Sequence, residues 1–92
     1  MRVIVEVYGR LRELMGWRKT EVHLPEDSTL NDLIDLLITQ RPELQDELFE
    51  GHSLKSYVKV LINGRDCRFF QELSTKLEDG HVVSIFPPSG GG

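Results

Sequence analysis

The sequence predicts a single α+β domain in which one main helix packs against a mixed sheet of about five strands. Three observations lead to this fold class. Runs of β-branched residues with a period of two occur at Val3–Val7 and over residues 58–62. One stretch in the middle carries apolar residues at helical spacing. The length of 92 residues, 39% of them hydrophobic, is enough for one core but not for two.

The chain opens with a predicted strand over Val3–Val7, where valines alternate with other side chains until Gly9. A single helical turn is expected over Arg10–Met15, because leucines recur there at helical spacing. Gly16 can end that turn, since glycine tolerates positive φ. A second strand is expected over residues 20–24.

The main helix is expected to begin at Thr29, which forms a capping-box pattern with Asp32. It should end at Arg41, because Pro42 disfavours the α region for the residue before it. Between these limits one apolar stripe needs a sheet to cover it. The stripe consists of Leu30, Leu33, Ile34, Leu37 and Ile38.

Pro42 can start a shorter second helix with Leu44 and Leu48 pointing inward, and residues 51–56 are expected to form a loop. A strand over residues 58–62 then leads into Asn63-Gly64, the dipeptide that most favours a type I′ hairpin turn.

The partner strand of this hairpin is expected near Cys67–Phe69, and Asp79-Gly80 is expected to form a turn. The last strand, Val82–Phe86, lacks clear alternation, so it is expected to be buried on both faces in the middle of the sheet. This order of elements is compatible with a β-grasp.

The composition excludes several classes of function. A net charge of −4, with 11 Lys and Arg spread along the chain, argues against nucleic-acid binding. No run of about 18 apolar residues and no signal peptide is present, so no membrane partner is expected. A single cysteine fits a reducing compartment. We therefore expect a cytoplasmic protein.

Side chains that might carry catalysis are few. His23, His52 and His81 stand without a serine, cysteine or carboxylate at a triad spacing, so ordinary surface or edge histidines are expected. Cys67 has only Arg65 and Arg68 nearby in sequence to lower its pKa, and a buried hydrophobic role is the favoured interpretation.

Four carboxylates are expected on one face of the second helix, where they are compatible either with a metal site or with a solvated acidic face. The solvated face is favoured, because acidic residues are common near helix N-termini, and no metal site is predicted. The four residues are Glu43, Asp46, Glu47 and Glu50.

The segment 87–92 is expected to form a flexible tail after a domain that spans residues 1–86. Gly90 to Gly92 cannot be a phosphate-binding loop, because no P-loop lysine, serine or helix follows them. The alternative is that these glycines are only a linker or an artificial addition, with no function of their own. Against it, the glycines follow an apolar strand closely, and Pro87-Pro88 stiffens the exit of the chain.

The carboxylate of Gly92 is then the reacting group, and the glycines before it give access to a narrow channel. A carboxylate is a poor acyl donor, so it needs activation, most simply by ATP held by a partner enzyme. We expect no cofactor on this chain itself. Partner contacts are expected at Phe86, Pro87, Pro88, Gly90 and Gly91, although Phe86 can equally be a core residue.

The ending from Leu77 to Gly92 resembles that of the MoaD/ThiS-type sulfur carriers, the family of the molybdopterin-synthase small subunit. There a Leu-x-Asp-Gly-Asp-x-Val-x-x-Phe-Pro-Pro stretch runs into Gly-Gly. The stretch from Val7 to Leu14 is also similar to the start of that family. His81 stands where the family often has Asp, and Ser89 where Val is common.

The resemblance implies a ubiquitin-like β-grasp and a role as a carrier co-substrate that is not itself catalytic. An E1-like adenylyltransferase would adenylate Gly92, and a sulfurtransferase would supply persulfide sulfur to form a thiocarboxylate. The large subunit of molybdopterin synthase would then use this sulfur for the molybdenum or tungsten cofactor.

Other destinations for the activated Gly92 stay open. The chain can be a ubiquitin-like modifier that is joined to lysines through Gly92, or a sulfur carrier for tRNA or thiamine thiolation. A non-covalent interaction domain with an incidental glycine tail ranks last.

Overall fold

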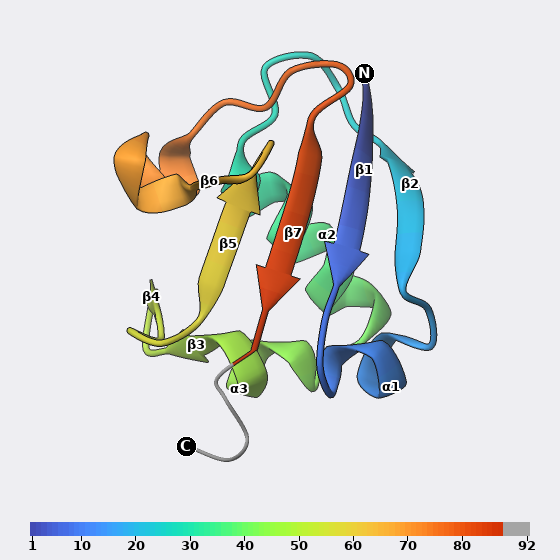
Figure 1. Cartoon of the computed structure of the whole chain (residues 1–92), viewed down its shortest axis with the longest axis vertical. Helices are drawn as coiled ribbons and strands as arrows, with labels where there is room; N and C mark the ends of the chain where they lie inside the picture. The colour runs from blue at the N-terminus through green and yellow to red at the C-terminus, as the bar shows by residue number, and fades with distance from the viewer. Residues whose placement is uncertain (88–92) are drawn as a thin grey trace.

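In the computed structural model, which describes residues 1–87, a mixed sheet faces the viewer of Figure 1 and α2 lies behind it. The predicted fold class is confirmed. Within the described residues the strands are β1 (Arg2–Val7), β2 (Lys19–His23), β3 (Phe49–Glu50), β4 (Ser53–Leu54), β5 (Lys59–Ile62), β6 (Arg65–Asp66) and β7 (Val82–Phe86). The helices are α1 (Leu11–Met15), α2 (Leu30–Gln40) and α3 (Leu44–Leu48), with 3₁₀ turns η1 (Cys67–Phe69) and η2 (Glu72–Ser74).

The main sheet has the order β2-β1-β7-β5-β6, while β3 and β4 form a separate two-stranded hairpin. β1 and β7 are parallel, and every other pairing in the main sheet is antiparallel. The last strand therefore lies in the middle of the sheet, as the sequence predicts. Parallel neighbours need a long connection, and here it contains α2.

α2 begins where the capping box predicts. The Thr29 side chain accepts from the Asp32 amide at 3.2 Å, and the Asp32 carboxylate accepts from the Thr29 amide at 2.9 Å. Two amides at the helix start thus find acceptors. The helix ends before Arg41, which is extended at φ −141°.

The core lies between α2 and one face of the sheet. The predicted stripe of α2 is buried, except that Ile38 is only half-buried. From the sheet, alternate residues of β1, β5 and β7 point toward the helix. These sheet residues are Val3, Val5, Val7, Val60, Ile62, Val83 and Ile85.

The expectation that β7 is buried on both faces is wrong. Val83 and Ile85 are buried, whereas Val82, Ser84 and Phe86 are half-buried on the other side. A sheet covered by helices on one face keeps the other face open. The apolar residues on that open face made the strand look non-alternating in the sequence.

Two further local predictions need correction. The partner strand of the Asn63-Gly64 turn is β6, two residues long, and Cys67–Phe69 forms the 3₁₀ turn η1 instead. The turn itself is confirmed, with φ of 50° and 83° at its central residues. Because this turn has only two residues, pairing begins directly at Arg65. Part of the expected loop at 51–56 is β4, paired with β3.

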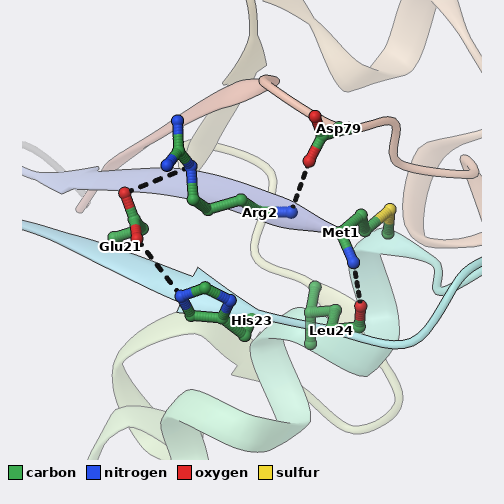
Figure 2. A network of polar contacts seen from close by, with 6 residues as sticks. All are labelled: Met1, Arg2, Glu21, His23, Leu24 and Asp79. Carbon is green, nitrogen blue, oxygen red and sulfur yellow. Dashed lines mark hydrogen bonds and ion pairs between the residues drawn. The ribbon is translucent and has the colours of Figure 1, made fainter.

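The end of the sheet that carries the N-terminus is fastened by polar contacts (Figure 2). The terminal amine of Met1 donates to the Leu24 carbonyl at 2.7 Å, and the Arg2 amide donates to the Asp79 carboxylate at 2.7 Å. Asp79 belongs to the predicted Asp79-Gly80 turn, which the structure confirms. The contacts hold the register of β1 against both neighbours.

We expect Thr29→Ala to lower the free energy of unfolding by about 1 kcal/mol, because α2 loses its N-cap acceptor. Thr39→Ala is the matched control, since Thr39 is exposed in the same helix and bonds only to the Asp35 carbonyl. Urea unfolding followed by circular dichroism measures both. Equal losses in the two variants would contradict the role of Thr29.

Candidate functional site

The candidate site lies where β7 ends, between the end of β1 and the start of β5. Val7 lies opposite Ile85 in the parallel ladder, and Lys59 lies opposite Phe86 in the antiparallel one. Figure 1 shows this end of the sheet next to α1 and α3, far from the N-terminus. The chain therefore leaves the sheet between two neighbouring strands.

Phe86 stacks on Tyr8 at this exit. The two ring centroids are 4.3 Å apart, and the planes differ by 8°. Both residues are half-buried on the open side of the sheet. Stacked aromatic pairs contribute about 0.5–1.5 kcal/mol beyond the area they bury. The stack thus fixes the last residue of β7 against the end of β1.

Arg12 covers the other side of this pair. Its guanidinium carbon lies 4.9 Å from the centroid of the Tyr8 ring, within the range of a cation–π interaction. Its Nε donates to the Val7 carbonyl at 2.9 Å. The single turn of α1 therefore supplies a positive charge beside the exit, held by a backbone contact.

Gly9 makes room for Pro87. Gly9 has φ of +56°, and a Cβ at this position would lie 2.9 Å from Cγ of Pro87. A contact that short forces a neighbour to move, so glycine suits this position for both its conformation and its lack of a side chain. We call Tyr8, Gly9, Arg12, Phe86 and Pro87 the exit cluster.

Two of the predicted partner-binding residues, Phe86 and Pro87, belong to the exit cluster, and Phe86 is a half-buried residue of the open face rather than a core residue. Pro88, Gly90, Gly91 and the predicted reacting residue Gly92 lie outside the described residues.

Tyr8, Gly9 and Arg12 were not predicted as site residues. Tyr8 does continue the open-face parity of β1, and Arg12 follows it at i+4.

The positions of the histidines and of Cys67 bear on the prediction that the chain has no catalytic triad. His23 is exposed with Glu21 as its partner at 3.2 Å, and His52 is exposed in a turn. Nδ1 of His81 accepts from the Glu78 amide at 3.0 Å. Cys67 is buried, and burial raises the pKa of its thiol, with the nearby Asp66 carboxylate adding to the effect. A neutral buried thiol is a weak nucleophile.

The four carboxylates do not share a helix face as predicted, because α3 ends at Leu48 and Glu50 belongs to β3. Glu47 instead pairs with Arg10 at 2.8 Å and so links α3 to the start of α1. In the described part of the chain, no three His, Cys, Asp or Glu residues gather where they would hold a metal ion. Among residues 1–87, no helix is long and apolar enough to cross a membrane.

Known proteins of similar sequence and structure agree with the overall fold. The chain is 32% identical to small archaeal modifier protein 3 of Haloferax volcanii, and the match covers all of both chains. A Pyrococcus furiosus structure provisionally assigned as molybdopterin converting factor, subunit 1, superposes with a TM-score of 0.79 at 31% identity, covering 96% of this chain and 98% of that one.

A chain in the crystal structure of the Amycolatopsis orientalis BexX/CysO complex superposes with a TM-score of 0.80 at 27% identity, covering 98% of this chain and 99% of that one.

A helix-backed mixed sheet with a central last strand, and these matches, define a ubiquitin-like β-grasp protein of the sulfur-carrier and modifier class. The ThiS family model matches residues 5–92, so the chain belongs to the ThiS family.

We expect Phe86→Ala to lower the free energy of unfolding by about 1–2 kcal/mol, because the stack on Tyr8 is lost on an open face. Ile85→Ala, one residue earlier and fully buried, is expected to cost about 2–5 kcal/mol, because it leaves a cavity in the core. Chemical denaturation of both variants measures the difference. A larger loss of unfolding free energy for Phe86→Ala than for Ile85→Ala would show that Phe86 acts as a core residue.

Proposed function

We propose that this chain is a sulfur carrier whose Gly92 carboxylate is adenylated by an E1-like enzyme, with ATP bound by that enzyme, and then converted to a thiocarboxylate. The observation that carries the proposal is the exit cluster. It holds the last residue of the central strand in place, so that residues 87–92, the proposed tail, start from a fixed point and can enter a partner. The full-length match to a small archaeal modifier protein supports a role in this class of proteins.

The chemistry follows in two steps. A carboxylate oxygen of Gly92 attacks the α-phosphorus of ATP, the bond to the β-phosphate breaks, and pyrophosphate leaves. The terminal sulfur of a persulfide, supplied by a sulfurtransferase, then attacks the acyl carbon and AMP leaves. A thiol finally cleaves the S–S bond, which leaves the thiocarboxylate and a disulfide. All catalytic groups for these steps belong to the partners.

The surface proposed to meet the activating enzyme is the open face of the sheet. Farther along the strands from the exit cluster, beyond Glu6 and Ser84, it carries the apolar residues Ile4, Leu61 and Val82, all half-buried and on the side away from α2. Exposed charges such as Lys19 and Glu21 stand along its β2 edge. A half-buried apolar centre with a charged rim is the usual anatomy of a protein interface.

For the destination of the sulfur, we propose the molybdenum or tungsten cofactor precursor, with this chain as the small subunit of molybdopterin synthase. The Pyrococcus furiosus structure with its provisional assignment supports this choice. The second candidate is conjugation to lysines of other proteins, which the modifier protein of Haloferax volcanii supports. Sulfur transfer to tRNA or to a thiamine precursor is a further candidate, and it would start from the same thiocarboxylate.

We expect the purified protein, incubated with ATP, an E1-like partner and a persulfide donor, to gain the mass difference between sulfur and oxygen at Gly92. Intact-protein mass spectrometry and fragmentation of the C-terminal peptide measure it. A variant without Gly90, Gly91 and Gly92, otherwise identical, is the control, because removal of Gly92 alone would leave a Gly-Gly ending. An unmodified protein in the presence of a partner that activates another carrier would refute the proposal.

The destination is decided by following the charged protein. With a molybdopterin-synthase large subunit and the cyclic pterin precursor, we expect one dithiolene product for every two thiocarboxylates consumed, because a dithiolene contains two sulfur atoms and each carrier donates one. Isopeptide-linked Gly92 on cellular lysines, found by digestion and mass spectrometry without such product, would instead establish the modifier role.

A further inference from the structure

Large aromatic side chains stand exposed beyond the open face, on the side of the sheet where β5 is covered only by the two-residue strand β6. Tyr57 is 60% exposed, Phe69 is 79% exposed and Phe70 is 44% exposed. In the described part of the chain these are the large hydrophobic side chains left exposed. Three such residues within one short stretch exceed the scattered exposure usual for a soluble protein.

Arg68 brings the aromatic residues to one edge. Its guanidinium donates to the carbonyls of Ser56 at 3.1 Å and Val58 at 3.3 Å, which flank Tyr57 in sequence. It also pairs with the Asp66 carboxylate at 3.4 Å. η1 is therefore held against the start of β5, in the place where the short strand β6 no longer pairs with β5. Phe69, next to Arg68, thus lies on the same edge as Tyr57.

This edge is close to the exit of the chain. Lys59 lies opposite Phe86, and Tyr57 lies in the turn two residues before Lys59. Gly92 lies five residues beyond Pro87, a span of at most roughly 17 Å when extended. An enzyme that binds Gly92 therefore lies within roughly this distance of the chain exit, beside the start of β5.

The charge of the edge differs from that of the whole chain. Residues 55–70 contain four cations, Lys55, Lys59, Arg65 and Arg68, against the single carboxylate of Asp66, although the net charge of the protein is −4. Lys59 is exposed. A protein surface with carboxylates around an apolar hollow complements such an edge. The negative net charge disfavours a polyanion such as RNA.

We propose that Tyr57, Lys59, Phe69 and Phe70, the β5-edge surface, form a second docking surface for the activating enzyme, and that this surface binds an acidic, apolar-centred patch of that enzyme. The inference rests on the proposed function, because it takes that enzyme as the partner. It adds the start of β5 and the residues of η1 to the contact proposed for the sheet face. Arg68 positions the surface, since its side chain joins η1 to β5.

Binding of the purified protein to its E1-like enzyme, measured by calorimetry without ATP, tests the surface. We expect the double variant Tyr57→Ala/Phe69→Ala to bind about tenfold more weakly, a loss typical of truncated aromatic anchors. Its thermal midpoint should stay unchanged, because both side chains are exposed. In ATP–pyrophosphate exchange, KM for the carrier should rise while kcat stays constant.

Charge reversal supplies a matched pair. Lys59→Glu on β5 and Lys76→Glu, beside the start of α2 and outside the main sheet, change the net charge equally, and both lysines are exposed. We expect Lys59→Glu to weaken binding about tenfold at low salt and less at high salt, because salt screens exposed charges. Lys76→Glu should weaken it much less.

Wild-type affinity in the aromatic double variant, or equal losses for the two charge reversals, would overturn the proposal. So would a wild-type protein that does not bind the enzyme, or one whose aromatic variant loses affinity for tRNA but not for the enzyme. Binding without adenylation would refute the proposed function and leave the docking surface standing.

Discussion

The parallel pairing of β1 with β7 is the constraint on which the rest of the structure depends. It joins the two strands that lie farthest apart in the chain and puts the last one in the centre of the sheet. Closing so long a connection costs conformational entropy, which the burial of α2 against both strands must offset. The exit of the chain is therefore built only when the whole domain is folded, since every neighbour of Phe86 comes from elsewhere in the sequence.

The one-sided covering of the sheet follows from the same topology. The crossover through α2 covers one face, and the described chain has no second long helix for the other. Apolar residues on that open face are thus left half-buried. Tyr8 and Phe86 stack there, with Arg12 and Gly9 completing the exit cluster. Apolar side chains on an open face cost little free energy when a partner protein covers them. Such a face therefore suits a class of proteins that act through partners.

Local signals in the sequence predicted most of the elements. The capping box of Thr29 and Asp32 and the turn at Asn63-Gly64 act through contacts within a few residues, so they can be predicted without knowing the fold. Cys67–Phe69 was mispredicted as a strand because nothing local shows that pairing with β5 ends at Asp66. The non-alternating run of β7 was read as two-sided burial, because a half-buried open face and a buried one carry the same residue types.

The sequence by itself determined the fold class and the ends of the main helix, since each depends on short-range patterns. The carrier hypothesis also came from the sequence, because it starts from the glycines that end the chain. The tertiary structure alone decided what surrounds the exit of the chain. The stack of Phe86 on Tyr8, the space that Gly9 leaves for Pro87 and the link from Arg68 to the start of β5 all depend on strand register and on contacts between distant segments. One sequence read alone does not show the register in which distant strands pair, because register is fixed by the packing of the whole core.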